Sequence, residues 1–262
     1  MARLKGEFIV GSIGAIVYRI VNNQQVLQAK QARGKVNLAV ASLCAAVIMG
    51  KVSSLAKHIR HSLQKAIDGC YDGKMINRLT AEVSAIIMQC KTGNAISFGR
   101  FSFCGLSGFD FNINSPMRES ISFSPAVTQA EGELIVSLPD IVMPEQLHFP
   151  IGASTCEISI DVSLISLKDN LIAQYPLRQA VRVERSMQVM PGRDFTFAIP
   201  GGCLCILSLS LKYSSVKNNM VTLYNNKTFN PVCILDAFLT DGDFVADQDV
   251  LWLEMSGVNF YE

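Results

Sequence analysis

The first 115 residues of this 262-residue chain contain no proline, and all nine prolines fall between Pro116 and Pro231. Because proline interrupts helices and central strands, the early part of the chain can form long regular elements, and the later part should be divided into short ones. Charge is also scarce, at 17% of the residues, against about 25% in typical soluble domains. With 49% hydrophobic residues, the composition indicates either apolar surface that meets another chain or a large, well-filled core.

Long apolar runs are missing as well. The uncharged stretch from Val36 to Gly50 has fifteen residues, fewer than the roughly 20 that a helix needs to cross a bilayer. The apolar run from Phe8 to Tyr18 follows Arg3 and Lys5 as in a signal peptide, but no small-residue cleavage site accompanies it. We therefore predict no membrane span and no signal peptide. The final location stays open, and an extracellular or particle assembly is compatible with it.

The eight cysteines do not follow the spacing of a disulfide framework. Free cysteine behaves as a small hydrophobic residue, which suits Cys44 within an apolar helical segment. We therefore expect the chain to fold with reduced cysteines, in a reducing compartment.

Recognisable catalytic or metal-binding patterns are also absent. His58 and His61 lie three residues apart but lack a matching carboxylate ligand, and Cys203 and Cys205 form one C-x-C pair without a second pair. Neither a G-x-S-x-G nucleophile turn nor a complete glycine-rich phosphate loop is present. We predict a protein that is not an enzyme, with no catalytic, cofactor-binding or metal-binding residues and no cofactor. The acidic cluster from Asp236 to Asp249 lacks EF-hand spacing, and whether it binds a cation stays open.

Residues 1–34 are expected to form an N-terminal β-arm. The segment from residue 5 to residue 31 is rich in β-formers, and the turn-prone pair Asn22-Asn23 divides it. This pattern predicts a hairpin or an extended arm. An isolated two-stranded ribbon is at best marginally stable in water, so the arm should pack on another structure.

Residues 35–93 are expected to form a helical hairpin. Apolar residues recur at steps of three and four from Val36 to Ile67 and again from about Lys74 to Cys90. The stripe of the first helix consists of Val40, Leu43, Cys44, Val47, Ile48, Val52, Leu55, Ile59, Leu63 and Ile67. Gly69 and the pair Asp72-Gly73 should end the first helix and turn the chain.

Residues 94–262 are expected to form a mainly antiparallel β-sandwich of the jelly-roll kind. The clearest strand runs from Cys156 to Leu164, with the even-numbered residues inward and Glu157, Ser159, Asp161 and Ser163 outward. Further strands are predicted at 95–104, 108–114, 132–138, 178–185, 193–199, 203–213, 219–224, 230–239 and 249–255. Short strands at this spacing favour a sandwich or jelly-roll, so the fold class is α+β.

Charge follows the same division of the chain. Residues 1–91 carry 13 Lys/Arg against 4 Asp/Glu, and residues 92–262 carry 10 against 18. The cations are dispersed and few aromatic residues accompany them, so we do not expect nucleic acid as a partner. Opposite charge on two parts of one subunit instead favours head-to-tail association.

Three short motifs resemble an uncharacterised protein family found in Bacteroidota. They are Leu4-Lys5-Gly6 with Gly11, Gly14, Val17-Tyr18-Arg19 and Val26-Leu27, then Gly108-Phe109-Asp110-Phe111-Asn112, then Phe149-Pro150-Ile151-Gly152-Ala153. Gln28 departs from the pattern, which has a basic residue after the hairpin. The resemblance implies a glycine-punctuated N-terminal hairpin, a helical hairpin and a C-terminal β region. It implies no assigned activity.

The apolar arm and the charge division together predict a structural subunit whose partner is itself. The arm is expected to add to the sheet edge of a neighbouring copy while the basic helices face an acidic β surface. Such contacts build a homopolymer, either a filament or a virion-like particle. The residues expected at this interface are Phe8, Ile9, Val10, Gly11, Ile13, Gly14, Ile16 and Val17. The alternative is a non-enzymatic β-sandwich module that binds a carbohydrate-like ligand. Whether the arm packs on its own chain or on a neighbour stays open.

Overall fold

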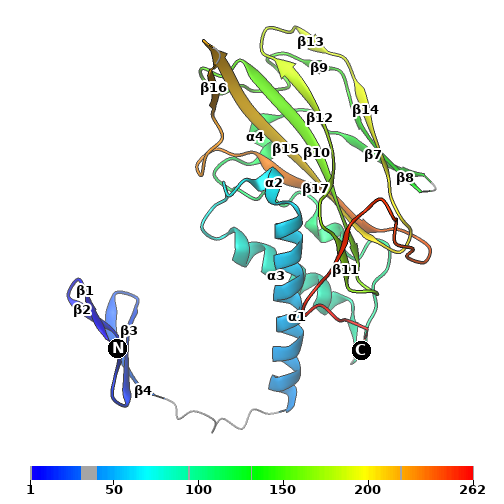
Figure 1. The fold of residues 1–262 in the computed structure, drawn as a ribbon. Helices are drawn as coiled ribbons and strands as arrows, with labels where there is room; N and C mark the ends of the chain where they lie inside the picture. Colours follow the sequence, from blue (N-terminus) through cyan, green and yellow to red (C-terminus); the bar gives the residue numbers. More distant parts are fainter. Residues whose placement is uncertain (1, 31–39, 94, 131, 219, 262) are drawn as a thin grey trace. The chain divides into compact units, whose positions relative to one another are not determined.

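A computed structural model describes residues 2–30, 40–93, 95–130, 132–218 and 220–261 (Figure 1). The fold is mixed α+β, and every strand pair in these residues is antiparallel, which confirms the predicted class. The chain divides into two compact units, residues 1–46 and 47–262. The domain boundary predicted between residues 34 and 35 lies outside the described residues.

The N-terminal sheet is a four-stranded meander. Its strands are β1 (Arg3–Lys5), β2 (Phe8–Ile13), β3 (Ile16–Val21) and β4 (Gln24–Ala29), paired in chain order. Asn22 and Asn23 form the last turn with φ of 49° and 62°, the conformation that tight hairpins favour at both central positions. The sequence predicted one hairpin or an arm. The structure has three successive hairpins, because Gly6 and Gly14 also take positive φ and reverse the chain.

The second unit contains most of the helical structure. The helices are α1 (Val40–Ser62), which begins before the unit boundary, α2 (Gln64–Ile67), α3 (Met75–Gln89), the 3₁₀ turn η1 (Cys104–Leu106) and α4 (Met117–Ser120). α1 and α3 occur close to the two ranges predicted from periodicity. The short α2 interrupts the end of the first predicted helix, and Asp68 and Gly69 then leave the helical conformation with positive φ.

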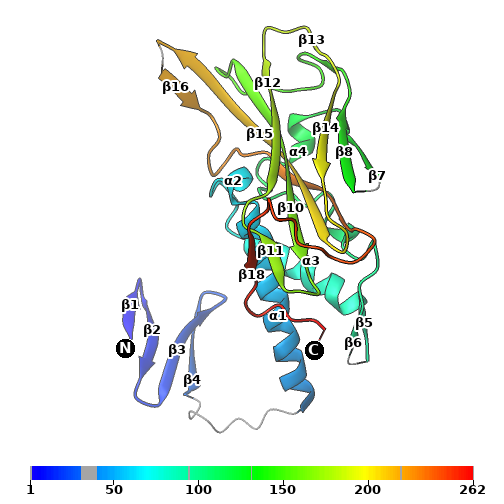
Figure 2. The same cartoon turned by 45° about the vertical axis from the view of Figure 1, so that its right-hand side comes forward.

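A large curled sheet forms the centre of the second unit (Figure 2). Its strands are β10 (Thr155–Ser166), β11 (Leu171–Ala173), β12 (Leu177–Glu184), β15 (Leu204–Lys217), β16 (Met220–Leu223), β17 (Val232–Leu239) and β18 (Trp252–Glu254). A three-stranded sheet contains β7 (Ala126–Ala130), β8 (Glu133–Leu138) and β14 (Arg193–Ala198). Two small pairs are β5 (Lys91–Thr92) with β6 (Ala95–Ile96), and β9 (Ile141–Val142) with β13 (Val189–Met190). Most predicted strands are present, but two are wrong over most of their length. Of 95–104 only Ala95–Ile96 is a strand, and η1 begins at Cys104. The range 108–114 forms only a single bridge, at Asp110.

One face of the two central strands, β10 and β15, is an apolar ladder. Ile158 pairs with Leu211, and Ile160 pairs with Leu209, and all four are fully buried. They pack against side chains of the smaller sheet such as Phe195. Full burial of one such side chain stabilises the fold by about 1.5–3 kcal/mol. The prediction that the even-numbered residues of this strand face inward is therefore correct.

The opposite face of β10 and β15 is covered by helices. Buried residues of α1 and α3, among them Leu55 and Val83, share one core with Leu204 on β15. Val258 and Phe260, close to the C-terminus, belong to the same core. The helical segment predicted at 35–93 and the β region predicted at 94–262 are thus held together by common packing.

The helical layer changes the environment of the residues predicted to face outward on β10. Ser159, Asp161 and Ser163 are at most 1% exposed, so their outward prediction is wrong. Alternation identified the polar face correctly but could not reveal that helices cover it. Arg178 lies 3.5 Å from Asp161, and burial raises the pKa of this carboxyl.

Candidate assembly surface

The N-terminal sheet has one predominantly apolar face. Cross-strand partners share a face, and the pairs Ile13–Ile16 and Tyr18–Leu27 lie on the same side, as does Ile20. We call these five residues the apolar face. The other side of β3 and β4 mixes Arg19, Gln24 and Gln28 with Val17, Val21 and Val26. The side that carries the apolar face is therefore the more apolar of the two.

Within the first unit, no other described segment covers the apolar face. No residue of β1 to β4 is buried, and Ile13 and Leu27 are 53% and 57% exposed. The large sheet of the second unit, by contrast, has its central apolar face fully buried. An exposed apolar face of this kind is a candidate interaction surface.

Gln25 is the polar residue on this side of the sheet, and its amide bonds to backbone groups. Its Oε1 accepts the Ile9 N–H at 2.8 Å, and its Nε2 donates to the carbonyl oxygens of Ile9 at 2.9 Å and Arg19 at 3.1 Å. β2 departs from its pairing with β3 at Gly11, where φ is 122°. The Gln25 amide therefore replaces strand pairing that this bend removes.

The predicted interface residues lie in the middle of the meander. Phe8, Ile9, Val10, Gly11 and Ile13 are in β2, Ile16 and Val17 are in β3, and Gly14 is in the turn between them. β2 and β3 are the inner strands, so the free backbone edges belong to β1 and β4. Residues 8–17 can therefore contact a neighbour through side chains, while added strands would pair with β1 or β4. The apolar face also contains Tyr18, Ile20 and Leu27, which are not among the residues predicted at the interface, and their alternation continues that of Ile16 across the Asn22-Asn23 turn.

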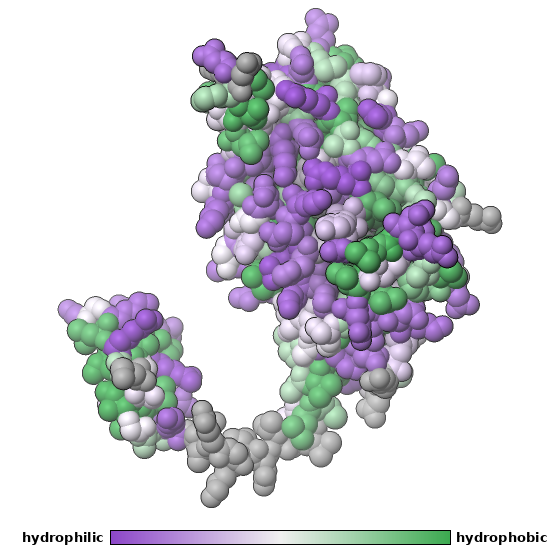
Figure 3. All heavy atoms as spheres, in the orientation of Figure 1, coloured by the Kyte–Doolittle hydropathy of each residue, from purple (hydrophilic) through white to green (hydrophobic). Residues whose placement is uncertain are grey.

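The start of α1 is a second exposed apolar region. Leu43, Val47 and Met49 are 46–60% exposed, and Figure 3 shows green side chains along the first turns of this helix. No charged residue occurs between Val40 and Gly50. The apolar stripe predicted for the first helix is buried only from Val52 onward. A helix segment that is apolar around its circumference is normally buried.

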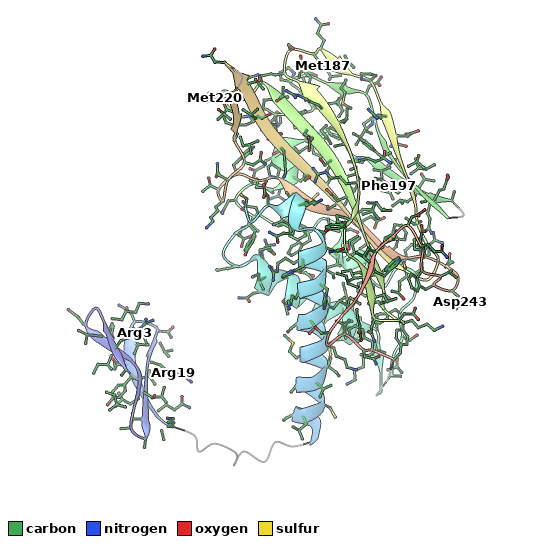
Figure 4. All side chains as sticks on the ribbon, in the orientation of Figure 1. Arg3, Arg19, Met187, Phe197, Met220 and Asp243 are labelled. Carbon is green, nitrogen blue, oxygen red and sulfur yellow. The ribbon has the colours of Figure 1, made fainter. Side chains whose placement is uncertain are left out.

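The hairpin of β15 and β16 carries a third exposed apolar group. Val216, Met220, Val221 and Leu223 are all exposed, and Figures 3 and 4 place this hairpin at one end of the large sheet. β16 pairs with β15 only. Its other backbone edge is therefore available for strand pairing within the part of the chain that the structure describes.

Charge differs between the two compact units. Residues 1–46 contain six Lys/Arg and one Asp/Glu, and residues 47–262 contain 17 and 21. In the acidic cluster, Asp241 binds Arg100 at 2.8 Å and Asp243 lies 3.6 Å from Lys168. Across the described ranges, no three His, Cys, Asp or Glu side chains gather as a metal-binding group.

The histidine and cysteine residues that were considered as metal ligands make contacts typical of structural residues. His58 Nε2 lies 3.4 Å from the carbonyl oxygen of Ser256, and partial burial lowers the pKa of this histidine. Cys203 and Cys205 are buried on the sheet. Burial raises the pKa of Cys203 to about 12, so its thiol stays protonated at neutral pH and is a poor nucleophile or metal ligand.

No helix in the described ranges has the length and apolar character needed to cross a membrane. No protein-family model, curated protein or solved structure matches this chain. The surfaces described above therefore carry the functional proposal.

Proposed function

We propose that this protein is a structural subunit that assembles with copies of itself into a homopolymer, either a filament or a virion-like particle. The uncovered apolar face of the N-terminal sheet carries the proposal. Its occupant is a second copy of this chain, contacted through the apolar face and the free edges of β1 and β4. Protein surfaces rarely leave a contiguous apolar patch of this kind without a partner.

Charge supports association between unlike parts of two copies. The first unit is basic and the second is acidic, so the N-terminal unit of one copy is attracted to the larger unit of the next. A contact between two different surfaces repeats and either extends as a fibre or closes as a ring or shell. The apolar face supplies affinity, and the charge difference supplies direction.

The proposal also includes a sandwich architecture for the second unit. We infer that the large curled sheet and the β7–β8–β14 sheet act as the two layers of a jelly-roll-like sandwich. The shared core of Ile158, Leu209 and Phe195 supports this inference. Such sandwiches are common scaffolds of capsid subunits and of lectins.

The alternative function is a ligand-binding sandwich of the carbohydrate-binding kind, which would present aromatic rings as a platform. Trp252 instead packs edge to face against Phe244 at a centroid distance of 4.8 Å. The exposed rings of Phe101 and Tyr175 belong to separate segments. The apolar N-terminal face therefore favours assembly over this alternative.

Sedimentation velocity and negative-stain microscopy of the full chain test the proposal. The wild-type protein should form large species at micromolar concentration, and a variant lacking residues 1–39 should remain a monomer. Leu27→Lys places a charge on the apolar face and should weaken association at least tenfold. Gln28→Lys, on the other face of the same strand, is the matched control and should assemble as the wild type does.

Salt concentration separates the electrostatic contribution to association from the apolar one. At 1 M salt the Debye length falls to about 3 Å, so the charge-guided part of association should weaken while apolar contacts persist. A wild-type protein that stays monomeric at high concentration contradicts the proposal. Equal effects of Leu27→Lys and Gln28→Lys would show that the apolar face is not the interface.

A further inference from the structure

A cavity of about 500 Å³ lies within the second unit, beside β17. Its floor includes Leu209, Cys233 and Met117, all less than 9% exposed. Ser124 and Leu235 also line it. The volume falls in the range of small-molecule sites, which are mainly apolar with a few fixed polar groups.

The fixed polar group in this cavity is Asp110. Its backbone is held in place because Phe109 and Phe111, on either side, bond to β17, and its carbonyl oxygen accepts from Arg78 at 2.9 Å. Its Oδ1 accepts the Met117 N–H at 2.9 Å. Oδ2 has no hydrogen-bond donor among the described residues. Asp110 is thus preorganised, with one carboxylate oxygen facing no partner.

Arg118 supplies the opposite charge in the same cavity. Burial raises the pKa of Asp110, and the hydrogen bond from Met117 and the positive charges of Arg118 and Arg78 act against that rise. Arg118 directly follows Met117, whose N–H binds Oδ1 of Asp110, and both charged residues line the same cavity. They form no ion pair with each other in the described structure. A carboxylate and a guanidinium that do not bind each other, beside an apolar surface, match a ligand that carries both a positive and a negative charge.

We propose that this cavity binds a small zwitterion with an apolar side chain, of which an apolar α-amino acid is the simplest example. The ammonium group of the ligand binds Oδ2 of Asp110, and its carboxylate binds the guanidinium of Arg118. The side chain packs against Leu235 and Pro125. The ligand and its site are independent of the assembly proposed above, since the cavity lies wholly within the second unit.

Isothermal titration calorimetry of the full chain tests the site with three probes that share one ring. Phenylalanine carries both charges, phenethylamine only the positive one, and phenylacetate only the negative one. Phenylalanine should bind at least tenfold more tightly than either analogue, because each hydrogen bond to a charged group contributes roughly that factor or more. No binding of phenylalanine at millimolar concentration overturns the proposal, as does equal binding of phenethylamine.

Variants locate the binding. Asp110→Asn keeps an oxygen for the Met117 N–H and should lower phenylalanine affinity about 10- to 100-fold. Arg118→Gln should weaken phenylalanine but not phenethylamine. Ser124→Trp, from an exposed lining position, should block all three probes without disturbing the core. The control Asp140→Asn alters an aspartate that accepts the Gly192 N–H at 2.6 Å outside the cavity, and should leave binding unchanged. Unchanged affinity in Asp110→Asn contradicts the assignment.

Discussion

The N-terminal sheet and the large curled sheet are both antiparallel and both have an apolar face, but only the large sheet has that face covered by other elements of its own unit. In the large sheet, Ile160 and Leu209 are fully buried between strands and a second sheet. In the N-terminal sheet, the equivalent residues Ile16 and Leu27 remain exposed. The alternation of apolar and polar residues in the sequence therefore predicts the strands of each sheet. Burial of the apolar face depends on whether other segments of the chain pack on it. The same contrast occurs within α1, which is exposed at Leu43 and buried at Leu55.

The largest expected effect compares two leucines of α1. Leu55→Ala leaves a cavity in the helix-side core and should lower the free energy of unfolding by about 2–5 kcal/mol. Leu43→Ala, on the exposed start of the same helix, should change it by less than about 0.5 kcal/mol. Urea denaturation of both variants measures the difference. If Leu43→Ala is as destabilising as Leu55→Ala, the start of α1 is covered within the monomer and the comparison fails.

An intermediate effect is expected at Asp72, which joins the start of α3 to the segment after η1. Its carboxylate accepts from Arg78 and from the N–H groups of Lys74 and Ile113. Burial alone would raise the pKa of Asp72, but these bonds outweigh it and lower the pKa. Asp72→Asn should cost about 1–3 kcal/mol at neutral pH.

The sign of this shift sets the pH dependence. A lowered pKa in the folded state stabilises the protein above the ordinary aspartate value, and that contribution is lost as pH falls through the folded value. The stability difference between wild type and Asp72→Asn should therefore be constant near neutral pH and shrink below about pH 4. Asp243→Asn, at a surface ion pair, is the control and should show a difference of less than about 1 kcal/mol. A difference for Asp72→Asn that grows in acid would contradict the assignment.

The smallest effect is expected in the N-terminal sheet. Gln25→Ala removes the amide that bonds to Ile9, and should weaken the sheet locally by about 0.5–1.5 kcal/mol. Hydrogen exchange measured by NMR should show faster exchange of the Ile9 amide and no change in the second unit. Gln28→Ala, on the opposite face, should leave the Ile9 amide as it is. If Gln25→Ala also destabilised the second unit, the two regions would be energetically coupled.

Local pattern was sufficient to predict much of the fold. Three- and four-residue spacing predicted α1 and α3, and alternation predicted β10 and the pairing face of Ile158 and Ile160. Burial of Asp161 was not predictable, because it depends on helices that lie about a hundred residues earlier in the chain. The exposure of Leu43 was missed for the same reason, since periodicity does not show where the covering surface ends.

The candidate sites were predictable to different degrees. An apolar, glycine-punctuated N-terminal segment was visible in the sequence, but its division into four strands was not, because Gly6 and Gly14 could equally have stood within strands. The Asp110 cavity gave no sequence signal. It combines Met117, Arg118 and Cys233, whose proximity comes from the bridge between residues 110 and 233. Long-range pairing of this kind is set by the whole fold.

The packing of Val258 and Phe260 against the helices has a consequence for biosynthesis. The contact between His58 and Ser256 spans 198 residues, so the helix-side core cannot close until residues 256–260 have left the ribosome. At about 5–20 residues per second, the roughly 200 intervening residues take on the order of 10–40 s to synthesise. The N-terminal sheet is complete in sequence by residue 29. The N-terminal sheet therefore exists as a complete sequence throughout the interval in which the helix-side core of the second unit is still open.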